Sequence, residues 1–112
     1  MAKTIAIDFD GTITEYSPYP IMGKIREAAK KYIKLLHSKG YKLVLWTART
    51  GVYLHECLNA LEDAELITYF ELPYLASGKI SADFYIDDRS VTGRIKWKKI
   101  YKYIIKNIKE KK

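Results

Sequence analysis

The stretch Ile5-Ala6-Ile7-Asp8-Phe9-Asp10-Gly11-Thr12 decides the fold, because a short apolar run leads into two carboxylates and a glycine. The apolar run predicts the end of a strand buried on both faces, as in a parallel sheet. Asp8 would lie at the carboxyl end of that strand, where open α/β sheets place their ligands. In a continuing strand Asp10 would point to the same side as Asp8, and Gly11 permits a sharp turn. Two close carboxylates invite a cation, and a site of oxygen ligands favours Mg2+.

Two simpler interpretations of this stretch explain it less well. A polar turn is the usual role of Asp residues before Gly, but a turn does not need two acids directly against a buried strand. A calcium loop of the EF-hand type starting at Asp8 would need a bidentate Glu at its twelfth position, which is Tyr19 here. We therefore expect a metal or phosphate site at this strand end.

The length and composition indicate a single globular domain spanning residues 1–112. The predicted strand begins almost at Met1, which leaves no room for a signal peptide, and no apolar run is long enough to span a bilayer. We expect a cytoplasmic protein with no membrane partner. The single cysteine, Cys57, excludes an internal disulfide. Its helical spacing with Leu54, Leu58 and Leu61 predicts a buried thiol.

The net charge of +7 belongs to the end of the chain. Residues 94–112 hold nine Lys or Arg and one acid, whereas residues 1–93 carry a net charge of −1. This segment predicts a basic amphipathic helix, whose inward residues would be Trp97, Ile100, Tyr101, Ile104, Ile105 and Ile108. A Lys-rich outer face is ordinarily solvated, but binding to nucleic acid or to an anionic surface is an alternative function for this helix.

The order of the predicted elements indicates a Rossmann-like α/β domain. A loop at 14–20 contains two prolines, a helix follows over 22–39, and Gly40 ends it. A second strand over 41–46 leads through a short turn into a helix of about ten residues. Further strands are predicted over 66–70 and 84–86. Short strand–helix–strand connections imply parallel pairing, so we expect three layers and about four strands in the order 3-2-1-4.

In this topology Asp8, Thr47 and Asp87 converge, because each directly follows an apolar strand. Asp10 and Asp88 extend the cluster to four acids, which repel one another unless a cation is bound. The turn at Thr47 precedes a helix, so a hydroxyl and backbone N–H groups could bind an anion there, although a Thr before a helix is more often an N-cap. Lys79, Arg49 and Arg89 are nearby counter-charges. For the two arginines, salt bridges at a polar rim remain an alternative role.

The same residues resemble the motifs of the haloacid dehalogenase-like phosphohydrolases over about residues 3–90. Asp8-Phe9-Asp10-Gly11-Thr12 resembles the first motif, Thr47 the second, Lys79 the third and Asp87-Asp88 the fourth. The chain is similar to the shortest members, because the loop at 14–20 is too short to form the cap domain usually inserted there. One departure is that Ile80 follows Lys79, where proline is common.

The resemblance implies a Mg2+-dependent phosphatase. Asp8 would be the nucleophile that forms an aspartyl-phosphate, and Asp10 would be the acid/base. Mg2+ would be held by Asp8, Asp87, Asp88 and the backbone carbonyl of Asp10. The phosphoryl oxygens would be held by Thr47 and Lys79, with Ala48 and Arg49 in the same phosphate-binding set.

The substrate would be a phosphorylated molecule of unknown size, because an open site fits a large substrate or closure by another subunit. The leaving group has no evident pocket, and Tyr16 and Tyr19 are the nearest candidates to contact it. A binding module without useful turnover is the alternative of a different class. The presence of both Asp8 and Asp10 argues against it, since a module without catalysis needs no acid/base residue.

Overall fold

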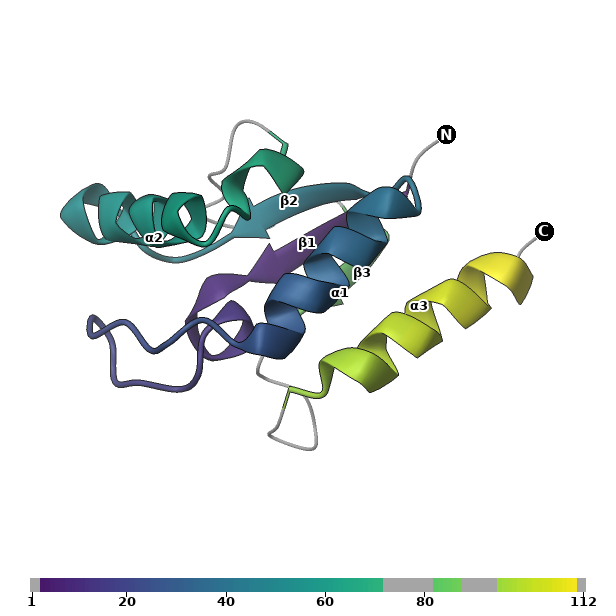
Figure 1. The fold of residues 1–112 in the computed structure, drawn as a ribbon, viewed down its shortest axis with the longest axis horizontal. Helices are drawn as coiled ribbons and strands as arrows, with labels where there is room; N and C mark the ends of the chain where they lie inside the picture. The colour runs from purple at the N-terminus through teal and green to yellow at the C-terminus, as the bar shows by residue number, and fades with distance from the viewer. Residues whose placement is uncertain (1–2, 72–81, 88–94, 111–112) are drawn as a thin grey trace.

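A parallel three-stranded sheet lies at the centre of the molecule (Figure 1). The computed structural model describes residues 3–71, 82–87 and 95–110. Its strands are β1 (Thr4–Asp8), β2 (Lys42–Trp46) and β3 (Phe84–Ile86), in the order β2-β1-β3. The first strand is therefore central, as predicted, and its apolar residues Ile5, Ala6 and Ile7 are fully buried.

The predicted third strand is wrong. Residues 66–70 instead contain a short 3-10 helix, η2 (Ile67–Tyr69), and only Phe70 forms a single parallel bridge with Leu43 of β2. The chain leaves the preceding helix through Glu65, which has a φ of 60°, and Leu66 is fully buried. Burial of Leu66 therefore overrides the β propensity of Ile-Thr-Tyr. Phe70 keeps the edge position beyond β2 that the predicted order gives to this segment.

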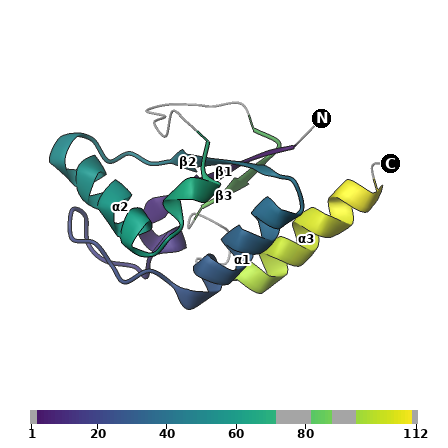
Figure 2. The same cartoon turned by 45° about the horizontal axis from the view of Figure 1, so that its top comes forward.

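Three helices pack on one face of the sheet, as Figures 1 and 2 show. They are α1 (Glu27–Ser38), α2 (Gly51–Asp63) and α3 (Trp97–Glu110). Their inward side chains, including Ile33, Leu61 and Ile104, join those of β1 and β2 in one hydrophobic core. The described residues form two layers, a sheet and one layer of helices, instead of the three expected.

The helix predicted over 22–39 begins only at Glu27. The residues before it belong to a closed loop, because Ile25 forms an antiparallel bridge with Thr14 and the Glu15 N–H donates to the Lys24 carbonyl. Pairing across this loop satisfies backbone groups that the predicted helix would have used. The loop from Thr14 to Arg26 is no cap domain.

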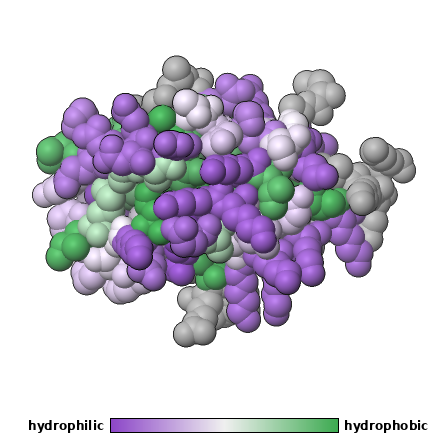
Figure 3. Space-filling model, in the orientation of Figure 1, coloured by the Kyte–Doolittle hydropathy of each residue, from purple (hydrophilic) through white to green (hydrophobic). Residues whose placement is uncertain are grey.

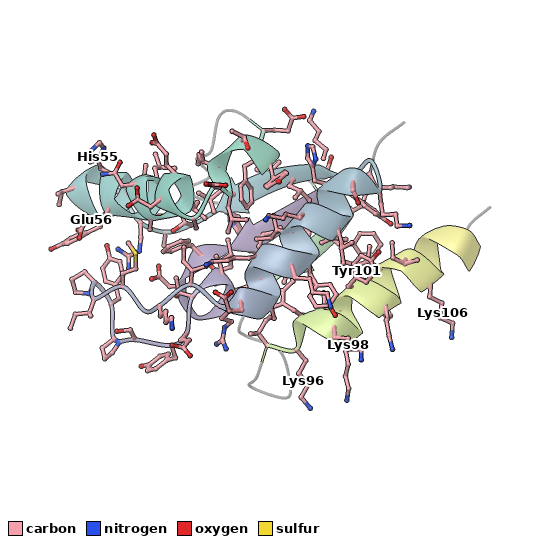
Figure 4. All side chains as sticks on the ribbon, viewed as in Figure 1. His55, Glu56, Lys96, Lys98, Tyr101 and Lys106 are labelled. Atoms are coloured by element: carbon pink, nitrogen blue, oxygen red, sulfur yellow. The ribbon has the colours of Figure 1, made fainter. Side chains whose placement is uncertain are left out.

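The basic C-terminal helix is a core element on its inner side. Trp97 and Ile104 are buried, and the ring of Tyr101 lies 5.3 Å from that of Tyr32 on α1. Figure 4 shows Lys96, Lys98 and Lys106 pointing away from the body of the molecule, and Figure 3 shows hydrophilic side chains over this face. The predicted inward position of Ile108 falls outside the described side chains.

Within the described part of the chain, no helix has both the length and the apolar character that a membrane crossing requires.

Candidate active site

The register of the sheet brings the predicted strand-end residues together. Ile7 of β1 pairs with Ile86 of β3, so Asp8 and Asp87 are the next residues on neighbouring strands. On the other side Asp8 pairs with Trp46 of β2, and Thr47 follows directly. Asp8 therefore lies between Thr47 and Asp87 at one edge of the sheet, as the topology predicted. Asp88, Lys79 and Arg89 lie outside the described residues.

The chain turns immediately after Asp8, so Asp10 does not continue the strand as expected. Phe9–Ile13 forms one wide turn, η1, closed by a hydrogen bond from the Thr14 N–H to the Phe9 carbonyl, and its backbone departs from helical geometry at Asp10 and at Gly11, which has a φ of 78°. The turn is held by hydrogen bonds within it, since the Thr12 hydroxyl donates to Asp8 Oδ2 over 3.3 Å and the Gly11 N–H donates to Thr14 Oγ1 over 3.1 Å. Gly11 supplies the positive φ that other residues adopt only with strain. Asp8 and Asp10 consequently have different surroundings.

Arg49 is the partner of Asp10. Its Nε donates to Asp10 Oδ2 over 2.8 Å and its Nη2 donates to Asp10 Oδ1 over 2.6 Å. Arg49 is 1% exposed although it lies in a loop, and the hydrogen bond to Asp10 raises the pKa of Arg49 above its usual value. Arg49 therefore forms a salt bridge, the alternative role that the sequence left open for it. Its partner is the carboxylate of Asp10 and not the phosphate that the resemblance implied.

Thr47 lies at the start of the turn between β2 and α2 and is 4% exposed. Its Oγ1 accepts a hydrogen bond from the Arg49 backbone N–H over 3.1 Å. A hydroxyl has one donor and two acceptor positions, so this contact does not consume the hydroxyl proton. Ala48 is exposed beside it, and α2 starts at Gly51 with no side-chain cap from Thr50. The segment can therefore offer a hydroxyl donor next to Asp8.

The closed loop from Thr14 to Arg26 borders the same site. Arg26 fixes its base, with Nε donating to the Thr14 carbonyl over 2.9 Å and Nη2 to the Gly11 carbonyl over 3.2 Å. At its tip, Tyr16 and Tyr19 are exposed, and the Tyr19 ring lies 5.3 Å from Arg49 Cζ. Of the two tyrosines that the sequence suggested for the leaving group, Tyr19 therefore lies beside Arg49.

The carboxylates of Asp8 and Asp87 suit a hard cation. Both side chains are half-buried at adjacent strand ends. Across residues 3–71, 82–87 and 95–110, no group of three His, Cys, Asp or Glu side chains is arranged to hold a metal ion. Mg2+ usually keeps several waters and takes only one or two protein carboxylates, so this pair and a backbone carbonyl fit it.

Cys57 has no role in this site as a nucleophile. It is fully buried in α2, and burial raises the pKa of its thiol from 9.0 to about 12. Only the thiolate is strongly nucleophilic, and it is not populated near neutral pH at such a pKa.

The chain is similar to known proteins in its sequence and in its overall fold. The sequence pattern of a family described as haloacid dehalogenase-like hydrolases matches residues 5–112. No protein of curated function matches the chain. A solved structure described as a conserved protein from Bacteroides thetaiotaomicron is 37% identical, with a TM-score of 0.72, and the match covers 100% of this chain and 93% of that one. With almost its whole length matched by the family pattern, the chain belongs to the haloacid dehalogenase-like hydrolases.

Proposed function

We propose that this hydrolase is a Mg2+-dependent phosphohydrolase that acts through an aspartyl-phosphate on Asp8. The observation that carries the proposal is the placement of Asp8 between Thr47 and Asp87 at one sheet edge, with Asp10 on the adjoining turn. The carboxylates of Asp8 and Asp87 and the hydroxyl of Thr47 therefore share one edge, with Asp10 close by in the chain, which supports the proposal.

Asp8 is the residue best placed to attack phosphorus. Its carboxylate lies at the rigid end of the central strand, and the Thr12 hydroxyl holds Oδ2. Attack by an Asp8 oxygen would break the bond between phosphorus and the leaving oxygen and transfer the phosphoryl group to Asp8. Hydrolysis of this acyl-phosphate by water would then restore the carboxylate, so two easier displacements replace one difficult one.

Asp10 would move the protons in both steps. It would protonate the leaving oxygen in the first step and deprotonate the attacking water in the second. Its side chain is 31% exposed, so the carboxylate can be reached from outside.

The phosphoryl oxygens require positive partners, since a carboxylate repels a phosphate anion. The Thr47 hydroxyl and the backbone beside Ala48 would donate to them, together with Lys79. Mg2+, when bound by Asp8, Asp87, Asp88 and the Asp10 backbone carbonyl, would supply the remaining charge neutralisation.

The test is an assay of phosphate release from alkyl and aryl phosphate monoesters with and without Mg2+. Asp8→Asn should abolish turnover, because an amide cannot form the acyl-phosphate. Asp10→Asn should slow hydrolysis of alkyl phosphates by about 10²–10⁴-fold. Mass spectrometry of acid-quenched Asp10→Asn enzyme should find a phosphoryl adduct on Asp8 with nitrophenyl phosphate, whose leaving group needs no proton.

Asp63→Asn, at the exposed end of α2, is the matched control and should keep wild-type activity. Full activity in Asp8→Asn would refute the mechanism.

A further inference from the structure

The guanidinium group of Arg49 binds the carboxylate of Asp10 through two parallel hydrogen bonds. The Nε–Oδ2 and Nη2–Oδ1 distances of 2.8 and 2.6 Å use both carboxylate oxygens at once. Such bidentate pairs fix the direction of a carboxylate as well as its distance, because the planar donor fork matches the planar acceptor.

Further contacts fix Arg49 itself. Its Nη2 also donates to the Pro20 carbonyl over 3.2 Å, and its Nη1 lies 3.4 Å from the Tyr53 carbonyl at the start of α2. The rings of Phe9 and Tyr19 lie 5.6 and 5.3 Å from its Cζ, within cation–π range. Arg49 is therefore immobilised by η1, by the closed loop and by α2.

Burial differs sharply across the pair. The Arg49 side chain is 0% exposed, whereas that of Asp10 is 31% exposed. A carboxylate has about four acceptor positions, of which Arg49 uses two. The remaining positions are where Asp10 would carry the proton that it gives to the leaving oxygen in the first step, and where it would receive a proton from the attacking water in the second.

From this geometry we infer that Arg49 is a positioning residue for the proposed phosphohydrolase reaction: it aims the carboxylate of Asp10 at the leaving oxygen and does not bind the phosphoryl group. The inference rests on the proposed function. It also links the acid/base to the loop, because Arg49 bonds to Asp10 and Pro20 through the same Nη2.

A purely structural role of the Arg49–Asp10 pair would give a different kinetic result from a positioning role. If the pair only stabilised the fold, weakening it would lower the rates of all substrates by a similar factor. A positioning pair should matter most where Asp10 must deliver a proton, which is in the release of a poor leaving group. The discriminating measurement is the rate of leaving-group release in the first turnover, since it excludes the later hydrolysis of the aspartyl-phosphate.

The experiment compares Arg49→Lys with wild type on an alkyl phosphate and on nitrophenyl phosphate. Lysine keeps the positive charge but cannot form the fork. First-turnover release of the alkyl alcohol should fall by about 10²-fold, the scale expected when a catalytic group is misplaced by 1 Å. Release of nitrophenol should change far less. In an Asp10→Asn background, Arg49→Lys should add little further loss for the alkyl phosphate.

Arg26→Lys is the matched control, because Arg26 bonds to carbonyls of the same region but not to Asp10. It should slow both substrates by a similar factor. Thermal unfolding of each variant confirms that the folded protein is assayed. Arg49→Gln, which keeps an amide donor, replaces Arg49→Lys in the comparison if the lysine variant unfolds.

The outcomes separate the two proposals. If the wild-type chain is active and Arg49→Lys slows both substrates equally, or slows neither, the positioning role is wrong and the phosphohydrolase proposal stands. If the wild-type chain hydrolyses neither substrate with Mg2+, the proposed function fails and the role of Arg49 in it fails as well.

Discussion

At the scale of single residues, the sequence predicted where the strand-end residues lie but not which residue pairs with Arg49. The strand-end positions of Asp8, Thr47 and Asp87 follow from apolar runs and parallel topology alone. The partner of Arg49 does not, because Asp10 is 39 positions away and its direction is set by the turn at Gly11. The sequence did contain one indication of this pairing. Arg49 follows closely after an apolar strand, and an arginine that is buried at such a place needs a carboxylate as its partner.

Asp87 allows a test of the metal site that does not depend on turnover. Asp87→Asn should weaken Mg2+ binding because it removes one of two neighbouring carboxylates at the sheet edge. The expected loss is at least about 10-fold, the lower limit found for removing even an outer-sphere partner of a metal. Calorimetric titration of the chain with MgCl2 measures it.

Asp83→Asn is the matched control for this titration. Asp83 lies at the opposite end of β3, where its Oδ2 accepts from the Thr4 N–H over 2.7 Å. Its loss should leave Mg2+ affinity unchanged. Equal affinity in Asp87→Asn and wild type would remove Asp87 from the proposed ligand set.

At the scale of elements, periodicity predicted the strands and helices that have a continuous buried face, and failed where the chain pairs with a distant segment. The apolar residues at 22–25 extend the pattern of α1, yet Ile25 pairs with Thr14. Likewise Ile67–Tyr69 has strand-like composition, but only Phe70 reaches β2. In both places the conformation depends on a contact with a residue more than ten positions away, and the pattern of neighbouring residues does not contain that information.

Gly23 gives a prediction for the closed loop. A Cβ at this position would collide with the Glu15 carbonyl oxygen, a backbone atom that cannot move away alone. Gly23→Ala should therefore push the two arms of the loop apart, weaken the Glu15–Lys24 hydrogen bond, and reduce stability by about 1–3 kcal/mol, as overpacking does. The proposed release of phosphate should also fall, because the loop carries Pro20 and Tyr19 against Arg49. Urea unfolding and the phosphate-release assay measure the two effects.

Gly40→Ala separates loop opening from a general loss of stability. Gly40 has a φ of 90° and nothing within 4 Å of an added Cβ, so the cost is backbone strain of about 1–2 kcal/mol. It lies before β2, at the sheet edge opposite Asp8, and activity should be kept. Activity that falls equally in both variants would argue against a role for the loop.

At the scale of the whole molecule, the candidate site depends on segments from both ends of the described chain being folded together. Trp97, the first residue of α3, donates from Nε1 to the Thr12 carbonyl over 3.0 Å, so the C-terminal helix supports the turn after Asp8. The order of the elements was enough to predict that β1 is central. It was not enough to predict the layers, because the faces on which the helices pack depend on side-chain burial across the whole sheet.

The buried thiol of Cys57 connects this common core to the pH dependence of stability. The pKa of Cys57 is about 12 in the folded protein, whereas its unperturbed value is 9.0. Between these values the unfolded chain has lost the thiol proton and the folded chain keeps it, so the folded state binds more protons. Stability from this group is then fully present below pH 9.0 and is lost as pH rises toward 12. The slope for one proton is about 1.4 kcal/mol per pH unit.

Cys57→Ala removes this titration and provides the comparison. The variant should be less stable than wild type at pH 8 because it leaves a small cavity. The difference should shrink as pH rises above the unperturbed thiol value of 9.0, since only wild type loses the thiol contribution. Burial also raises the pKa of Tyr41, but that group is present in both proteins and cancels in the difference. Urea unfolding of both proteins at intervals from pH 8 to pH 10.5 measures the effect. Parallel stability curves over this range would mean that the thiol ionises as readily in the folded protein as in the unfolded chain. Cys57 would then not be buried in the hydrophobic core.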